Sequence, residues 1–236
     1  GTYAINQGTL SAGDNYTIDF TGADFAITEK TLTVTVDAAQ SKIYGEADPV
    51  FTYVANGFEN GDDDTILTGA LARATGENVG TYAINQGTLS AGDNYTIDFT
   101  GADFEIIKKA LTITADDKQK IYGETNPALT FTYTGLVNGD TKVATEPSIS
   151  TTATASSNVG TYPIELSGGA DQNYEITLVN GGLTIGKKAL TITADDKQKI
   201  YGETNPALTF TYTGLVNGDT KVATEPSIST TATASS

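Results

Sequence analysis

The sequence contains no cysteine, histidine, tryptophan or methionine among its 236 residues. Without cysteine there is no disulfide framework, so any folded domain must be held together by packing alone. The absence of histidine and cysteine also removes most nucleophilic and acid–base arrangements that work near neutral pH. Serines such as Ser156 and Ser157 have no histidine partner, and nothing in the sequence sets two carboxylates in an apolar cleft. The sequence therefore predicts a protein that is not an enzyme.

Basic residues are also scarce. The chain has 13 lysines and arginines against 29 acidic residues, which gives a net charge of −16. Binding to nucleic acid needs a basic patch, so we expect no nucleic-acid partner, and an anionic membrane surface is disfavoured for the same reason. No apolar run approaches the roughly 18 residues that a transmembrane helix needs, so we expect no membrane insertion. The start at Gly1-Thr2-Tyr3, without methionine, suggests an internal piece of a larger protein.

Internal repetition is the strongest feature of the sequence. Residues 1–25 recur unchanged as residues 80–104, and residues 108–157 recur unchanged as residues 187–236. Both recurrences come 79 residues later. Self-similarity at a fixed period is the signature of tandem modules.

More diverged copies keep the same landmarks, such as the motif Lys-Ile-Tyr-Gly-Glu at residues 42–46, 120–124 and 199–203. We predict a partial repeat at 1–29, full repeats at 30–108 and 109–187, and a partial repeat at 188–236. A second register, cut before each Gly-Thr-Tyr, gives three nearly whole units. In the preferred register both ends are incomplete domains with unpaired strand edges, so we expect neighbouring sequence or neighbouring chains to complete them.

Short alternating strands fill the repeat at 109–187. In residues 110–115, Leu111, Ile113 and Ala115 point one way and threonines the other, which is typical of a half-buried strand. Further strands are predicted at residues 121–122, 129–134, 148–154, 162–166, 174–178 and 183–185, with 148–154 at a sheet edge. A turn is predicted at residues 137–140, and Asn180-Gly181 predicts a hairpin with a type I′ turn.

About six or seven strands per repeat, with no helical periodicity, predict an all-β fold. We expect a tandem array of small antiparallel β-sandwich repeats of about 79 residues, immunoglobulin-like in type. Gly160-Thr161-Tyr162 is expected to form a tyrosine corner, in which the hydroxyl bonds to nearby backbone. A β-grasp-like sheet is the alternative, and it would need a helix near residues 138–146.

Several motifs together resemble a known family. They lie at residues 122–123 (Tyr-Gly), 126–127 (Asn-Pro), 136–140 (Leu-Val-Asn-Gly-Asp), 159–162 (Val-Gly-Thr-Tyr), 173–174 (Asn-Tyr) and 180–181 (Asn-Gly). In combination they resemble the YGX-type MBG repeats of large bacterial surface proteins. That resemblance implies an extracellular location at the bacterial cell surface, a role in giant adhesins, including those of gliding bacteria, and no catalytic residue.

Near-identical copies are typical of a stalk, which needs length more than distinct sites. The joint Gly186-Lys187-Lys188 is short, so it restricts bending, and each repeat is expected to add roughly 35–45 Å. The partners of each repeat are then its neighbours in the chain, and the stalk presents a binding region elsewhere. Two alternatives stay open: repeats that bind glycan or an abiotic surface weakly by avidity, and repeats that self-associate into a fibre.

An acidic run at Asp62, Asp63 and Asp64 is the candidate metal site. Glu59 and Asn60 lie nearby, and oxygen ligands of this kind suit Ca²⁺, which is the only cofactor that the sequence suggests. The spacing does not match an EF-hand loop, so a solvated acidic loop is the alternative. A calcium titration of thermal stability separates the two.

Two further positions have a structural and a chemical interpretation. The Tyr-Gly pairs, such as Tyr122-Gly123, form either an aromatic platform for glycan or a buried tyrosine beside a glycine with positive φ, which the sequence favours. Lys120 close to an asparagine such as Asn173 suggests an intramolecular isopeptide bond.

Overall fold

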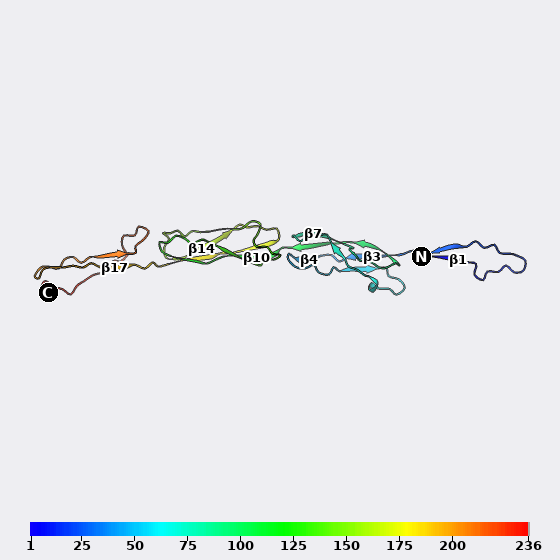
Figure 1. Cartoon of the computed structure of the whole chain (residues 1–236), viewed down its shortest axis with the longest axis horizontal. Coiled ribbons are helices and arrows are strands. Elements are labelled where there is room, and N and C mark those ends of the chain that lie inside the picture. Colours follow the sequence, from blue (N-terminus) through cyan, green and yellow to red (C-terminus); the bar gives the residue numbers. More distant parts are fainter. Residues whose placement is uncertain (236) are drawn as a thin grey trace. The chain divides into compact units, whose positions relative to one another are not determined.

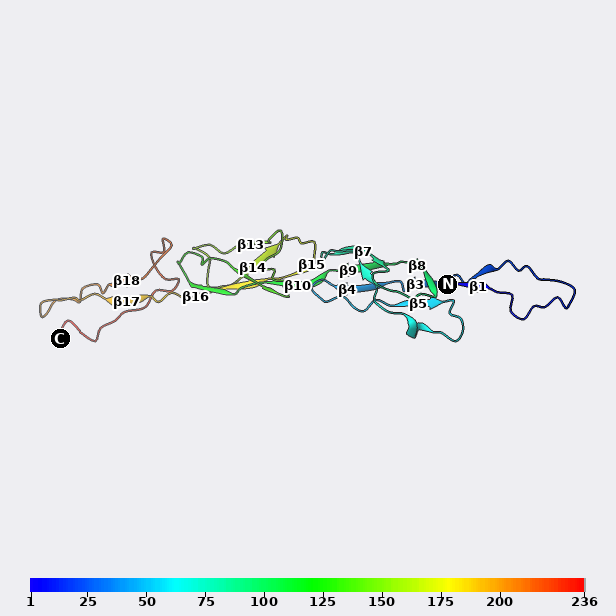
Figure 2. The ribbon, with the colours of Figure 1, turned by 45° about the vertical axis from the view of Figure 1, so that its right-hand side comes forward.

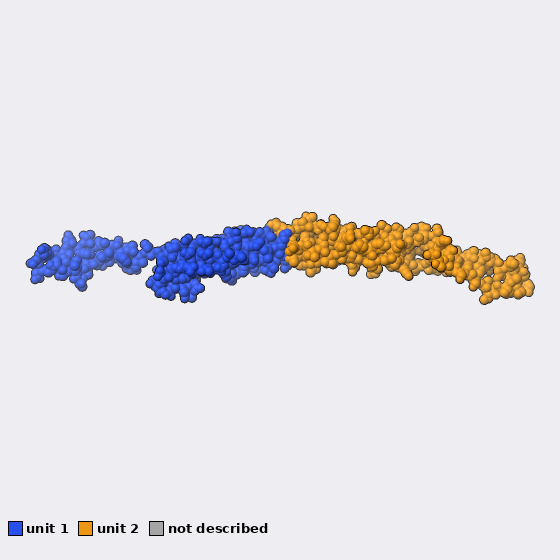
Figure 3. Space-filling view, turned by 180° about the vertical axis from the view of Figure 1, so that it is seen from behind, with its two compact units in different colours: residues 1–109 blue, residues 110–236 orange. Residues whose placement is uncertain are grey.

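A computed structural model describes residues 1–235, and the chain divides into two compact units, residues 1–109 and residues 110 onward (Figure 3). Each unit contains one full repeat and one partial repeat. The only helical element in the described residues is the three-residue 3-10 helix η1 (Asp64–Ile66). No helix among residues 1–235 is long and apolar enough to cross a membrane. The all-β prediction is confirmed, and the helix that a β-grasp-like sheet would need is replaced by η1 or by loop.

The full repeat of the first unit has seven strands. They are β3 (Lys30–Val36), β4 (Gln40–Ile43), β5 (Tyr53–Asn56), β6 (Ala72–Arg73), β7 (Gly80–Asn85), β8 (Tyr95–Thr100) and β9 (Asp103–Ile107). They form a three-stranded sheet in the order β5-β3-β8 and a four-stranded sheet in the order β4-β9-β7-β6 (Figure 2). The partial repeat before them pairs β1 (Thr2–Ile5) with β2 (Ala23–Ala26).

The full repeat of the second unit follows the same plan. Its strands are β10 (Lys109–Ala115), β11 (Lys118–Ile121), β12 (Phe131–Thr134), β13 (Ser148–Thr151), β14 (Gly160–Ser167), β15 (Tyr174–Val179) and β16 (Gly181–Gly186). The sheets are β12-β10-β15 and β11-β16-β14-β13, which puts β13 at the predicted edge. Figure 1 labels one strand of each sheet, β10 and β14. The partial repeat after them pairs β17 (Thr191–Ala194) with β18 (Phe210–Thr213).

Some strand pairs are parallel, which the expectation of an antiparallel sandwich did not include. β3 pairs with β8, β4 with β9, and β11 with β16 in the parallel sense. Parallel neighbours need a long connection, and more than 50 residues separate the strands of each pair. Alternation of side chains predicts which face is buried, and it carries no information about the direction of the neighbouring strand.

The hairpin predicted at Asn180-Gly181 was wrong. β15 and β16 belong to different sheets, and neither residue has the positive φ that a type I′ turn requires. A Cβ atom on Gly181 would lie 2.6 Å from the carbonyl oxygen of Ala115, and the Asn180 Oδ1 accepts a hydrogen bond from the Leu166 N–H at 3.0 Å. The dipeptide therefore forms a corner between sheets, where only glycine permits the close backbone approach.

The turn predicted at residues 137–140 is present, and it has the type I′ character expected of Asn-Gly. Asn138 and Gly139 have φ values of 56° and 80°, and the Asp140 N–H donates to the Val137 carbonyl at 2.9 Å. The tyrosine corner is also confirmed. The Tyr162 hydroxyl donates to the Asn158 carbonyl oxygen at 3.1 Å.

Each full repeat has its own buried residues. Leu111, Ile113 and Ala115 of β10 are buried, as their alternation predicts, together with Ile164 and Leu183 of the other sheet. In the first unit one core cluster is made of Leu32, Val34, Leu89, Ala91 and Tyr95. Burial of these side chains supplies the main stabilisation of a module that has no disulfide.

Candidate functional site

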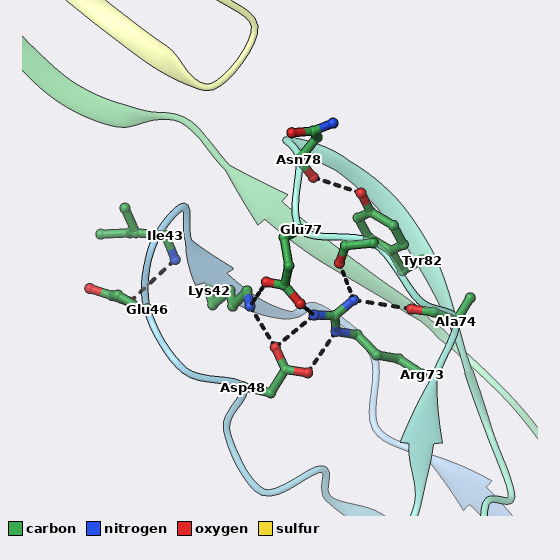
Figure 4. A network of polar contacts seen from close by, with 10 residues as sticks. Lys42, Ile43, Glu46, Asp48, Arg73, Ala74, Glu77, Asn78 and Tyr82 are labelled. Carbon is green, nitrogen blue, oxygen red and sulfur yellow. Dashed lines mark hydrogen bonds and ion pairs between the residues drawn. The ribbon is translucent and has the colours of Figure 1, made fainter. Parts of the chain in front are cut away.

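Four charged side chains gather in the repeat at 30–108 (Figure 4). Lys42 comes from β4, Asp48 from the loop after it, Arg73 from β6 and Glu77 from the turn before β7. The side chains of Lys42 and Arg73 are only 4% and 6% exposed. Long cationic side chains are rarely buried unless they are paired, so the partners of these two decide what the cluster does.

Both carboxylates bridge both cations. The Lys42 Nζ lies 2.7 Å from the Asp48 Oδ1 and 2.6 Å from the Glu77 Oε2. The Arg73 Nε lies 2.7 Å from the Asp48 Oδ2, and its Nη2 lies 2.6 Å from the Glu77 Oε1. The guanidinium also lies 5.1 Å from the ring centroid of Tyr82 and 5.4 Å from that of Phe104, within the range of cation–π contacts. The cluster therefore ties β4, β6 and two loops together.

Charge pairing sets the protonation of the cluster. The hydrogen bond from Arg73 is the main reason why the pKa of Asp48 is lowered, and that from Lys42 is the main reason why the pKa of Glu77 is lowered. Burial alone would lower the pKa of Lys42, but its bonds to Asp48 and Glu77 outweigh burial, and the pKa is raised. All four groups therefore carry full charge at neutral pH.

The cluster makes the repeat at 30–108 sensitive to acid. Because the folded-state pKa values of Asp48 and Glu77 lie below their ordinary values of 3.8 and 4.5, their contribution is complete above those values and is lost as pH falls through the lowered ones. We expect amide protection in residues 40–75 to fall more steeply than in residues 158–186 as the pH falls below about 4.5. Both segments have unique sequences, so hydrogen exchange with mass spectrometry reports on each repeat. An equal fall in both segments contradicts the prediction.

Each Tyr-Gly pair begins two residues after the motif's lysine, which is buried at Lys42 and Lys120. Their glycines Gly45, Gly123 and Gly202 have φ values of 85°, 90° and 90°, so the predicted positive φ is confirmed at all three. The tyrosines differ in exposure: Tyr44 is 6% exposed, Tyr122 is half-buried and Tyr201 is 78% exposed. The local conformation is therefore constant, while the surroundings of the tyrosine are not.

The chain matches the family model of the MBG domain of YGX type three times, at residues 32–105, 111–184 and 190–236. The chain belongs to this MBG family. No curated protein and no solved structure matches the chain. Each matched segment lies inside one of the repeats expected from the sequence, and the Tyr-Gly pair of the family name is present in all three.

The buried lysine is kept in the second MBG repeat, but its partners are neutral. The Lys120 Nζ donates to the carbonyl oxygens of Glu124 and Thr154 at 3.0 and 2.6 Å. Asn126 takes the place of Asp48 and donates to the Ala153 carbonyl at 2.6 Å. The same position of the MBG fold is thus held by an ion cluster in one repeat and by backbone carbonyls in the next. The isopeptide bond from Lys120 to an asparagine stays a prediction.

The acidic run of the first MBG repeat is engaged with its own loop. The Asp62 Oδ2 accepts from the Tyr95 hydroxyl at 2.8 Å, and the Asp63 Oδ1 accepts from the Thr65 N–H at 2.9 Å, which caps η1. The bonds from Thr65 lower the pKa of Asp63. Within residues 1–235, no group of three or more acidic, histidine or cysteine side chains is arranged to hold a metal, Asp62, Asp63 and Asp64 included. Calcium binding at this loop stays a prediction.

Proposed function

We propose that the chain is a non-catalytic stretch of an extracellular stalk on a bacterial cell surface, which gives reach to a binding region elsewhere in a longer adhesin. The repetition carries the proposal, since residues 1–25 are identical to 80–104 and residues 108–157 to 187–236. Identical copies add length without adding a new kind of site. Membership in the MBG family supports the surface location.

The position of the aromatic side chains favours a stalk over repeats that bind glycan or an abiotic surface. Phe104, Tyr174 and Tyr95 of the full repeats are 0%, 2% and 7% exposed. A tyrosine or phenylalanine that stacks on a ligand must present its face to solvent, and these side chains are used for packing. The net charge of −16 favours a soluble, self-repelling chain with no nucleic-acid partner.

Small-angle X-ray scattering tests the stalk. The chain is compared with a longer variant in which residues 109–187 are present twice in succession. A stalk of stiffly joined repeats is expected to gain roughly 35–45 Å in maximum dimension per added repeat, because strands of five to seven residues rise about 3.3 Å per residue. A gain below half of that value contradicts the proposal.

The two alternatives have their own measurements. Binding of the chain to a glycan array at millimolar affinity or better would favour adhesion by avidity. A sedimentation coefficient that rises with protein concentration would favour self-association into a fibre. The stalk predicts neither behaviour.

A further inference from the structure

In the second unit, a Tyr-Gly turn meets a turn of the following repeat. The Tyr122 hydroxyl of the repeat at 109–187 donates to the Asp219 Oδ2 at 3.2 Å. In the opposite direction, the Asn217 Nδ2 donates to the Ala155 carbonyl oxygen at 3.2 Å. Asn217 and Asp219 both belong to the Val-Asn-Gly-Asp turn at residues 216–219. One turn therefore accepts a hydrogen bond from the preceding repeat and donates another to it.

Val216, the first residue of that turn, lies directly against Gly123. A Cβ atom on Gly123 would stand 2.4 Å from the Val216 Cγ2 and 2.9 Å from its Cβ, which is closer than real side chains approach. The valine therefore occupies the space that any other side chain at position 123 would need. Glycine at this position satisfies two requirements at once, a φ of 90° and an open surface for a neighbour.

Gly202 provides the internal comparison. It has the same flanking sequence and the same φ of 90°, but a Cβ atom there would meet nothing within 4 Å. Tyr201 is accordingly 78% exposed, whereas Tyr122 is half-buried. The Tyr-Gly turn is thus the same in both places, and only the one at residues 122–123 has a following turn against it.

The receiving turn is closed by a backbone hydrogen bond of its own. Asn217 and Gly218 have φ values of 57° and 83°, and the Asp219 N–H donates to the Val216 carbonyl at 2.9 Å, which is the type I′ geometry. In the full repeat the equivalent Asp140 accepts from the Tyr174 hydroxyl at 2.7 Å. A carboxylate has room for several donors, so an inner tyrosine and the tyrosine of the preceding repeat are compatible.

We propose that the Tyr-Gly turn is the recognition half of a joint between consecutive MBG repeats. Its partner is the Leu-Val-Asn-Gly-Asp turn of the repeat that follows in the same chain. The motif that names the family then sets the angle between neighbouring repeats, in addition to the short covalent link at residues 186–188. The proposal does not depend on where the protein is located or on what it adheres to.

The joint also discriminates between repeats. The equivalent turn of the repeat at 30–108 reads Phe-Glu-Asn-Gly at residues 58–61, so Glu59 stands where the third copy has Val216. Glu59 forms an ion pair with Lys30 at 2.8 Å. A valine packs against a bare glycine surface by apolar contact, and a carboxylate in the same place brings a charge that must stay solvated. Val216→Glu is therefore expected to weaken the joint.

Two spin labels measure the joint, because the chain has no cysteine of its own. Labels on Thr132→Cys and Thr211→Cys stand at exposed positions of β12 and β18, one in each repeat. The parent chain is expected to give one narrow distance distribution. Gly123→Ala is expected to broaden it at least twofold, and Gly202→Ala, which has the same φ, is expected to leave it unchanged. A broad distribution in the parent, or equal effects of the two alanines, overturns the proposal.

Changes on the receiving side keep the test independent of the folding of residues 109–187. Val216→Ala and Val216→Glu are expected to broaden the distribution in that order, and to raise the rate of tryptic cleavage after the exposed Lys187 and Lys188 several-fold. A parent-like distribution and cleavage rate in Val216→Glu overturn the joint. The stalk would then still be judged separately, by the gain in scattering length per added repeat.

Discussion

Phe104→Ala is expected to lower the free energy of unfolding of the repeat at 30–108 by about 3–5 kcal/mol. Phe25→Ala, in an identical stretch of sequence, is expected to change stability by no more than about 0.5 kcal/mol. Phe104 is 0% exposed, whereas Phe25 is 58% exposed. The ring of Phe104 packs edge-on against Phe51, at 5.3 Å between centroids, and under the guanidinium of Arg73. Its removal leaves a cavity that the surrounding strands fill only in part.

Hydrogen exchange of peptides from residues 40–75 measures this effect, because that segment occurs once in the chain. Phe25→Ala is the matched control, since residues 1–25 and 80–104 are identical and the two changes differ only in the surroundings of the ring. Loss of protection in Phe104→Ala alone would show that β4, β6 and β9 share one core. Equal effects of the two changes would contradict the burial of Phe104 in a core that Phe25 lacks.

The contrast between Phe25 and Phe104 shows which part of the fold a local sequence pattern does not predict. Alternation in β10 predicts that Leu111, Ile113 and Ala115 are buried, and they are. The residues of β1 alternate in the same way as those of β7, yet Ile5 is 46% exposed and Ile84 is 2% exposed. A local pattern specifies which side chains would face a core. Whether a core is there depends on strands that are distant in the sequence.

The two Asn-Gly dipeptides of the repeat at 109–187 differ for a similar reason. At residues 138–139 the dipeptide forms the type I′ turn that its composition favours, whereas at 180–181 it connects two sheets. Gly181 is required there by the carbonyl oxygen of Ala115, which is 66 residues earlier in the chain and 2.6 Å from a Cβ position. Local turn propensity is overridden where the partner of a strand is chosen by tertiary packing.

The sequence pattern predicted neither the charged cluster nor the burial of Lys42 and Lys120, because in these strands the lysine faces inward. In β11, Lys120 is 6% exposed and the neighbouring Ile121 is 40% exposed. Strand alternation with the isoleucine facing the core would place the lysine in solvent, which is the opposite of what is found. The available signal was the recurrence of lysine before Ile-Tyr-Gly in three copies. Arg73, in a strand of two residues, left no periodic signal at all.

Asp48→Ala is expected to destabilise the repeat at 30–108 by about 3 kcal/mol. Asp48 bonds to both Lys42 and Arg73, whose side chains are 4% and 6% exposed. Without it, two buried cations share Glu77, whose side chain is 65% exposed and therefore screened by water. The cost is that of buried charge left without its inner partner, and it exceeds the net value of the ion pairs themselves. Urea unfolding and hydrogen exchange of residues 40–75 measure it.

Asn126→Ala in the following repeat is the matched control. Asn126 stands in the place of Asp48, but its amide bonds a neutral carbonyl oxygen and Lys120 keeps both of its own carbonyl partners. Loss of one neutral hydrogen bond is expected to cost about 1 kcal/mol.

In the Asp48→Ala background, Arg73→Met is expected to restore part of the loss, since it removes one unpaired cation and keeps an apolar stem against Phe104. If Arg73→Met adds to the loss, the guanidinium stabilises the repeat through its ring contacts and backbone bonds, and its charge is not what Asp48 balances.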